Sequence, residues 1–397
     1  MIKTLMELSD EELTFRFSAA VQRAFQEVYE NGWINALRAL MMPTKRYFLR
    51  VNTLKADVED VIETLASRGY KFKQLNYIEE AIYMNIEAGE ELPRPDKFIV
   101  ADRWAAENVL QGANLYIPGV LKYPPDLEKG DIIGVTDDDG LLVGVGVAEV
   151  SAIELRRKRK GVAVRMTHPV FKAPSTAELP EWKAGLVYPQ SLPSIIASRV
   201  FDPQPGEVIV DMCAAPGGKL THIAALTNDR AKIYGFDKSG RKVNALRELL
   251  KRMGIRNVIV AKMDTRYIDL KLPQLEADRV IIDPPCSALG VRPKLAANYT
   301  REELANFYTY QIQFLMPASK ILRRGGILLF SVCTITKQEI EGIAEYATSN
   351  LPFELADQEI FTGSTGIDRY SNCRCIQRFH PHIHDTPGFG IILLRKI

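Results

Sequence analysis

The sequence contains few cysteines, little net charge and no long apolar run. No apolar segment reaches the roughly 18 residues that a membrane-spanning helix needs, and the N-terminus lacks the basic-then-apolar pattern of a secretory signal. The formal net charge of +2 gives the whole protein little attraction for a polyanion, so any nucleic-acid surface must be local. The five cysteines form no secreted-domain framework and indicate free thiols in a reducing compartment. These absences predict a cytoplasmic protein without a membrane partner, and no obligate protein partner is evident.

At 397 residues the chain is too long for one ordinary core, and its pattern changes twice. Residues 1–95 mix helix-like and strand-like segments, which predicts a small α+β domain. Short β-rich runs separated by glycine, proline and aspartate predict a compact β-barrel over residues 96–172. Strand-like and helix-like segments alternate over residues 173–397, which predicts a doubly wound parallel sheet. The expected fold class is therefore α/β, with two smaller domains attached.

Local signals predict individual elements. Capping boxes, in which a serine or threonine precedes a glutamate by three residues, predict helix starts after Ser9, Thr300 and Thr336. The helix after Ser9 is expected to continue to Trp33, and a helix over 239–253 should end at Gly254. Six segments should form strands of the doubly wound sheet: 208–211, 232–237, 258–262, 279–283, 326–332 and 389–394.

The residues that follow these strands predict a nucleoside site, because open α/β sheets bind ligands outside the carboxyl ends of their strands. Three later strands end in the carboxylates of Asp237, Asp264 and Asp283, and Asp237 has the position from which a carboxylate accepts hydrogen bonds from ribose hydroxyls. The turn lacks the G-x-G-x-x-G spacing that seats a pyrophosphate, so a dehydrogenase is a weaker alternative. The first strand runs into a turn of small residues that lets backbone approach a ligand: Cys213, Ala214, Ala215, Pro216, Gly217, Gly218 and Lys219.

Two cysteines lie at the ends of neighbouring strands. Cys286 follows Asp283-Pro-Pro, and Cys333 closes the next strand of the sheet, so both thiols are expected over one cleft. A buried cysteine is most often an inert small hydrophobe, but two that face one ligand cleft indicate chemistry. C5 of cytosine is a poor nucleophile until a nucleophile adds to C6, and a thiolate suits that addition. A second thiol would then assist release of the product.

The motifs between residues 173 and 397 resemble those of the Nop/Sun (RsmB-like) RNA cytosine-C5 methyltransferases. They include the Tyr-Pro-Gln-Ser of 188–191, the 213–219 turn, Asp-Pro-Pro-Cys at 283–286 and Ser-Val-Cys-Thr at 331–334. The resemblance implies that Cys333 attacks C6 and that Cys286 assists product release. It also implies that the turn and the acids Asp237, Asp264 and Asp283 bind S-adenosylmethionine, with Lys219 and Asp283 close to the target base. DNA cytosine methyltransferases use the thiol of the Pro-Cys motif instead, which would make Cys286 the attacking residue.

The two remaining regions resemble RNA-binding parts. Residues 96–172 are similar to a PUA domain, and residues 1–95 are similar to the N-terminal extension of the same family. A PUA domain ahead of the catalytic domain resembles the subgroup that methylates cytosine 72 of tRNA, which makes tRNA the first substrate to consider and ribosomal RNA the second. A non-catalytic RNA assembly factor is the alternative from another class. The basic run expected to contact RNA phosphates is Arg156, Arg157, Lys158, Arg159 and Lys160.

Potential metal ligands gather near the C-terminus. Cys373, Cys375, His380, His382 and His384 lie within a dozen residues. The spacing lacks the paired C-x-x-C form of a structural zinc site, so no metal is expected there.

Overall fold

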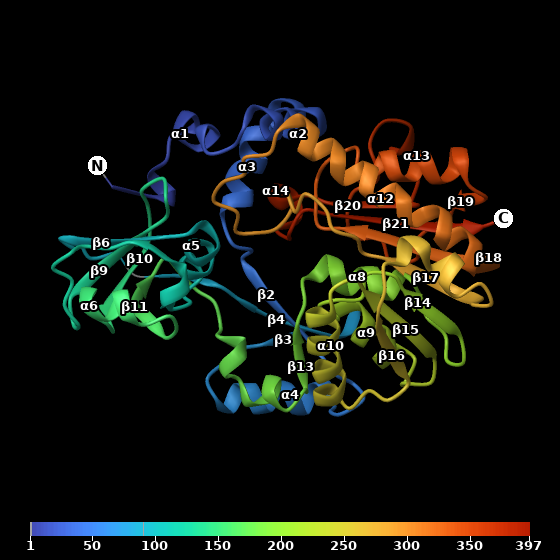
Figure 1. Ribbon diagram of the computed structural model, residues 1–397, viewed down its shortest axis with the longest axis horizontal. Coiled ribbons are helices and arrows are strands. Elements are labelled where there is room, and N and C mark those ends of the chain that lie inside the picture. Colours follow the sequence, from blue (N-terminus) through green and yellow to red (C-terminus); the bar gives the residue numbers. More distant parts are fainter. Residues whose placement is uncertain (1, 90) are drawn as a thin grey trace.

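The computed structural model describes residues 2–89 and 91–397, and an eight-stranded sheet forms its C-terminal part (Figure 1). The strands lie in the order β16-β15-β14-β17-β18-β21-β19, with β20 beside β21. The first five of these pair in parallel, and β21 runs antiparallel to β18. Their bounds are β14 (Val208–Asp211), β15 (Lys232–Asp237), β16 (Val258–Lys262), β17 (Ala277–Ile282), β18 (Leu322–Val332), β19 (Phe353–Leu355), β20 (Ile376–Phe379) and β21 (Phe389–Lys396).

Helices cover both faces of this sheet because alternate strand residues point to opposite sides. Ile209 joins the apolar cluster under α8, α9 and α10, whereas its neighbour Val210 joins the cluster under α12 and α13. The predicted helix start after Thr300 is present, and Gly254 ends α10 in the left-handed conformation as expected. The helices are α8 (Leu192–Val200), α9 (Gly218–Leu226), α10 (Gly240–Met253), α11 (Ile268–Lys271), α12 (Arg301–Ile321), α13 (Glu341–Asn350) and α14 (Pro381–His384).

A four-stranded antiparallel sheet in the order β13-β2-β4-β3 lies beside the α8, α9 and α10 side of the large sheet. Arg50 on β2 is fully buried and donates from Nε to Gln190 Oε1 and from Nη2 to Thr221 Oγ1, each at 2.8 Å. Gln190 belongs to the 188–191 motif, so Arg50 links this motif to α9, which covers the large sheet. The elements are β2 (Arg46–Val51), β3 (Lys73–Leu75), β4 (Ile78–Asn85) and β13 (Val187–Pro189), with the helices α4 (Val58–Ser67) and α7 (Pro180–Lys183).

The middle of the chain forms a mostly antiparallel sheet in the order β7-β11-β10-β9-β6-β8. The N-terminal β1 (Lys3–Thr4) pairs with β10, and a two-stranded sheet of β5 (Glu87–Ala88) and β12 (Phe171–Lys172) lies where the chain enters and leaves. The remaining elements are β6 (Lys97–Ala101), β7 (Leu115–Tyr116), β8 (Val120–Lys122), β9 (Ile132–Thr136), β10 (Leu141–Ala148) and β11 (Val162–Pro169), with α5 (Arg103–Leu110) and α6 (Ala152–Arg157).

The prediction of one helix from Ser9 to Trp33 was wrong, because the segment divides into α1 (Asp10–Phe15), α2 (Ala19–Tyr29) and α3 (Trp33–Met41). The Ser9 capping box is present, but the chain turns at Arg16, whose side chain binds Asp137 and the carbonyl of Leu295. Tertiary contacts therefore override the helical pattern. Within the described ranges, no helix has the length and apolar character needed to cross a membrane.

The helix predicted after Thr336 was also wrong at its start. Residues 337–340 form a turn, and α13 begins only at Glu341. The Glu339 carboxylate accepts a hydrogen bond from Thr336 Oγ1 instead of capping a helix. Its other partners belong to the site described next.

Candidate active site

A cavity of about 320 Å³ opens at the carboxyl ends of the parallel strands. Among the predicted residues, its lining includes Cys213, Ala215, Asp237, Asp264, Asp283, Cys286 and Cys333. The order of the strands reverses between β14 and β17, which is where such sheets bind their ligands. The structure therefore brings both predicted thiols and all three predicted acids to one cavity.

The rest of the glycine turn lies behind this lining. Ala214, Pro216, Gly217, Gly218 and Lys219 do not border the cavity, and Gly218 opens α9. Gly217 has a φ of 110°, and a Cβ on it would lie 2.5 Å from Leu246 Cδ1. Glycine is required there because both the backbone conformation and the packing of α10 exclude a side chain.

The two thiols are in direct contact. Cys286 Sγ and Cys333 Sγ lie 3.3 Å apart, at the ends of the neighbouring strands β17 and β18. The hydrogen bond from Cys286 lowers the pKa of Cys333, although burial opposes this. The same hydrogen bond, together with burial, raises the pKa of Cys286 well above its usual value. Cys333 is therefore the thiol that ionises more readily, and Cys286 is its hydrogen-bond donor.

An ion pair lies beside the thiols. Lys219 Nζ is 2.6 Å from Asp283 Oδ2, and Ser331 Oγ donates to Asp283 Oδ1 at 3.4 Å. Lys219 is buried, and its ammonium lies 5.2 Å from the centre of the Phe389 ring. This ammonium also lowers the pKa of Cys333 through its charge. Asp283, which lines the cavity, thus holds the Lys219 ammonium in place behind the lining.

The buried carboxylate of Glu339 connects the two cysteine loops. Its Oε2 accepts from the backbone N–H of Ser287 at 3.0 Å and from Gln311 Nε2 at 2.7 Å. Its Oε1 accepts from Thr334 Oγ1 at 3.2 Å and from Thr336 Oγ1 at 2.8 Å. Ser287 follows Cys286, and Thr334 follows Cys333. One side chain thus fixes the backbone beside each thiol.

The other half of the cavity is lined by strand-end acids and apolar side chains. Asp237 accepts from the backbone N–H of Ser239 at 2.7 Å, and Lys242 Nζ lies 3.9 Å from its other oxygen. Asp264 is bound by the guanidinium of Arg266, which lowers the pKa of that carboxyl. Met212, Met263 and Phe314 add apolar surface to this half, so it combines carboxylate acceptors with an apolar wall, as small-molecule sites commonly do.

Several cavity residues were not singled out from the sequence. Next to the lining but outside it, burial raises the pKa of Asp211, at the end of β14, to about 7. Tyr310 and Phe314 reach the cavity from α12, about 70 residues after Asp237. Lys238, Lys242 and Thr265 complete this wall. Tyr310 and Phe314 belong to no sequence motif, so nothing in the sequence indicated that they line the cavity. Asp211 could have been identified, because it closes the first predicted strand, where ligand-binding residues are expected.

Comparison with known proteins identifies the family. The model described as 16S rRNA methyltransferase RsmB/F matches residues 198–395, the PUA domain model matches 97–170, and the ferredoxin-like domain model of RsmF/B-like methyltransferases matches 21–88. A tRNA (cytosine(72)-C(5))-methyltransferase of Pyrococcus horikoshii is 40% identical over an alignment of 395 residues that covers 97% of this chain and 99% of the relative. The chain belongs to the RsmB/F family of RNA cytosine-C5 methyltransferases.

Two further relatives agree with this membership. NSUN6 of Homo sapiens, a tRNA (cytosine(72)-C(5))-methyltransferase, is 33% identical over an alignment of 324 residues that covers 72% of this chain and 68% of the relative. The crystal structure of NSun6 from Pyrococcus horikoshii with SFG has a TM-score of 0.89 at 39% identity and covers 96% of this chain and 99% of that chain. The predicted family, fold class and type of enzyme are confirmed, and the cofactor of this RsmB/F methyltransferase is S-adenosylmethionine as predicted.

The basic run of the RsmB/F methyltransferase lies on the surface of its PUA domain. Arg156 and Arg157 end α6, and all five residues from 156 to 160 are exposed. Lys158 is paired with Glu154 at 2.7 Å, so its charge is partly neutralised. Lys158 and Lys160 border a hollow of about 430 Å³ beside Arg165 and Asn114. The run is thus available to a large ligand, at a place separate from the thiol cavity.

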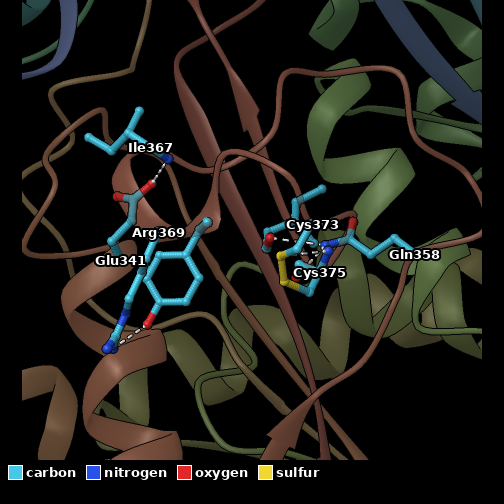
Figure 2. The surroundings of a disulfide bond; sticks show 8 residues. Glu341, Gln358, Ile367, Arg369, Cys373 and Cys375 are labelled. Carbon is cyan, nitrogen blue, oxygen red and sulfur yellow. Dashed lines mark hydrogen bonds between the residues drawn. A yellow bond between two sulfur atoms is a disulfide. The ribbon is translucent and has the colours of Figure 1, made fainter.

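The tail of the methyltransferase corrects one expectation. Cys373 and Cys375 are joined in a disulfide, which Figure 2 shows beside Gln358, whereas the sequence predicted free thiols. Gln358 Nε2 donates to the carbonyl of Cys375 at 3.0 Å and holds this short loop against the sheet. The described cysteines that remain free are Cys213, Cys286 and Cys333, all of which line the cavity. Cysteine spacing alone did not separate the tail pair from these thiols.

Proposed function

We propose that this chain methylates C5 of cytosine 72 in tRNA, beside the 3′ end of the acceptor stem, with S-adenosylmethionine as the methyl donor. The observation that carries the chemistry is the contact of Cys286 with Cys333, 3.3 Å apart at the head of the cavity. The choice of tRNA rests on the relative of Pyrococcus horikoshii, which covers 97% of this chain. Ribosomal RNA is the second candidate substrate, since the matching family model is described as a 16S rRNA methyltransferase.

Cys333 is the proposed nucleophile. Its sulfur forms a bond to C6 of the cytosine, and the electron pair of the C5–C6 double bond makes C5 nucleophilic. The bound cofactor supplies a sulfonium methyl group that C5 accepts. A base then removes the proton of C5, the C5–C6 double bond re-forms and the Cys333 thiolate leaves. The lowered pKa of Cys333 favours this residue over Cys286 as the attacking thiol.

The other catalytic roles follow from the contacts of this pair. Cys286, which stays protonated, is proposed to assist release of the product. Lys219 and Asp283, joined at 2.6 Å, are proposed to hold the target base through its polar edge. The cofactor is assigned to Asp237, Asp264 and Asp283 together with the turn from Cys213 to Lys219, of which Cys213 and Ala215 reach the cavity.

The RNA is assigned to the domains outside the catalytic sheet. We place domain boundaries at residues 95/96 and 172/173, although β13 and β1 each pair with a sheet outside their own region. The exposed run from Arg156 to Lys160 is proposed to contact phosphates. The cytoplasmic location stays a prediction.

The test is methylation of a transcribed tRNA, with cytosine 72 replaced by uracil in a matched transcript. We expect one methyl group per tRNA at position 72 and none in the replaced transcript. Transcribed ribosomal RNA serves as the competing substrate. Methylation of ribosomal RNA in preference to tRNA contradicts the choice of substrate, and methylation of neither contradicts the activity.

The role of the basic run can be tested by measuring how the affinity for RNA depends on salt concentration. Replacing Arg156, Arg157, Lys158, Arg159 and Lys160 by glutamine should reduce the slope of log affinity against log salt by about 0.7 to 0.9 for each phosphate that the protein no longer neutralises. Lys129 is an exposed lysine near Glu149 on the same domain, and Lys129→Gln is the control. An unchanged slope in the five-residue variant would mean that the run faces solvent.

A further inference from the structure

An exposed tryptophan of the PUA domain lies beside two cations. Trp104, in the first turn of α5, is 62% exposed. Arg103 Cζ lies 5.6 Å from the centre of its ring, and Lys294 Nζ lies 5.7 Å from it. A large apolar ring that remains open to solvent beside two positive charges suits a nucleotide, because a base stacks on the ring and a phosphate binds the cations.

Neither cation forms a close ion pair with a neighbouring acid in the described residues. Among residues 2–89 and 91–397, no carboxylate oxygen lies within 4.0 Å of the charged group of Arg103 or Lys294. Lys294 is only 4% exposed, and burial lowers its pKa although the charge of Glu107 opposes this. A buried cation without an ion-pair partner is costly, and an anionic ligand reduces this cost.

The ring is also held at a fixed place relative to the thiols. Lys294 belongs to the loop that leaves Cys286, and in this loop Gly290 N–H donates to the carbonyl of Cys333 at 3.0 Å. At its far end, Leu295 N–H donates to Glu107 Oε1 at 3.0 Å, and Arg103 Nη1 donates to the carbonyl of Ala296 at 3.3 Å. One loop therefore joins the catalytic pair to α5, on the side of the barrel that faces the rest of the molecule (Figure 1).

We propose that Trp104 stacks on a nucleotide adjoining the target cytosine in the same RNA strand, while Arg103 and Lys294 bind its phosphate. This inference rests on the proposed function, because it takes the RNA to enter the thiol cavity. Stacking tolerates any base, so this contact positions the strand and reads no sequence. It uses residues apart from the basic run, which lies on α6 and the loop that follows it.

Fluorescence tests the contact without catalysis. The sequence contains three tryptophans, so the variant Trp33→Phe/Trp182→Phe leaves Trp104 as the reporter. A stacked base should quench its emission in a saturable way when transcribed tRNA is added without cofactor. Unchanged Trp104 emission under conditions where tRNA binds, as measured by filter retention, overturns the inference.

Kinetics give the second measurement. Trp104→Ala should lower kcat/KM for tRNA about 5- to 100-fold, and Trp104→Phe should retain most of the activity because a ring remains. Phe15→Ala removes an exposed ring of α1 and is the matched control, expected to leave kcat/KM unchanged. If the unaltered protein fails to methylate tRNA while Trp104 is quenched, the proposed function fails and the stacking contact stands. Normal methylation by Trp104→Ala overturns the contact and leaves the proposed function in place.

Discussion

The two halves of the cavity are built differently. The thiol half is bordered by Cys286, Cys333 and Asp283, whose ion-pair partner Lys219 lies behind the lining, and nearly every polar atom there has a partner within the protein. The cofactor half presents Asp237 and Asp264 to the cavity among apolar side chains. A reacting group must be held in one geometry before the substrate arrives, whereas a cofactor site gains its hydrogen bonds when the ligand binds.

This difference predicts how each half responds to substitution. In the thiol half the Glu339 carboxylate accepts hydrogen bonds from both cysteine loops, so a single substitution should disturb a step of the reaction. In the cofactor half each acid is proposed to contact the ligand separately, so a single change should weaken binding by the energy of its own hydrogen bonds. Substitutions at the thiols, at Glu339 and at the cavity acids test this contrast.

The largest effect is expected at the thiols. Cys333→Ala cannot form the bond to C6, so methylation should fall below detection and no covalent complex should form. Cys286→Ala should still form the adduct but release it about 100-fold or more slowly, since it lacks the group that assists expulsion. Denaturing gel electrophoresis of tRNA with cofactor should then show a protein–RNA species for Cys286→Ala.

The control for the thiols is the double variant Cys373→Ala/Cys375→Ala, which removes the two cysteines outside the cavity and should retain turnover. If Cys333→Ala traps RNA and Cys286→Ala is inert, the roles are reversed and the mechanism is of the DNA type. Full activity of both single variants would exclude covalent catalysis.

The sequence predicted the cofactor half better than the thiol half. Strand ends could be read directly, since β14, β15 and β16 have the predicted bounds, and the acids that follow strands must lie at one edge of the sheet. The proximity of the two thiols also followed from neighbouring strands. The contacts that fix the two cysteine loops could not be predicted from the sequence. Thr336 and Glu339 have the spacing of a capping box, whereas Glu339 binds Ser287 and Gln311, which are distant in sequence.

Glu339→Gln should have the intermediate effect and identifies a positioning residue. Glutamine keeps the shape but has one acceptor oxygen where the carboxylate serves four donors, so the two cysteine loops should lose their fixed separation. We expect kcat to fall about 10- to 100-fold, since a cost of about 1.5 to 3 kcal/mol accompanies the removal of each bond to a charged group. The KM for tRNA should change little because Glu339 is buried.

The pH profile separates this positioning role from a loss of folding. The proposed reaction needs the Cys333 thiolate, so kcat/KM should rise with pH through the pKa of Cys333. The negative charge of Glu339 raises the pKa of both thiols, and its removal should move the rising limb to lower pH. Glu345→Gln, on the exposed face of α13, should leave the limb in place. A rate that falls without any movement of the limb indicates a structural role only.

Asp237→Ala should have the smallest effect on the reaction, because it acts on the cofactor alone. Loss of hydrogen bonds worth about 1.5 to 3 kcal/mol weakens cofactor affinity about 10- to 150-fold, and kcat at saturating cofactor should be nearly unchanged. Asp264→Ala should weaken affinity less, because Arg266 already occupies that carboxylate. Asp269→Ala removes an acid paired with Lys320 outside the cavity and is the calorimetric control. Should Asp237→Ala abolish methyl transfer even at saturating cofactor, Asp237 would belong with the reacting groups, and the division of the cavity into two halves would be wrong.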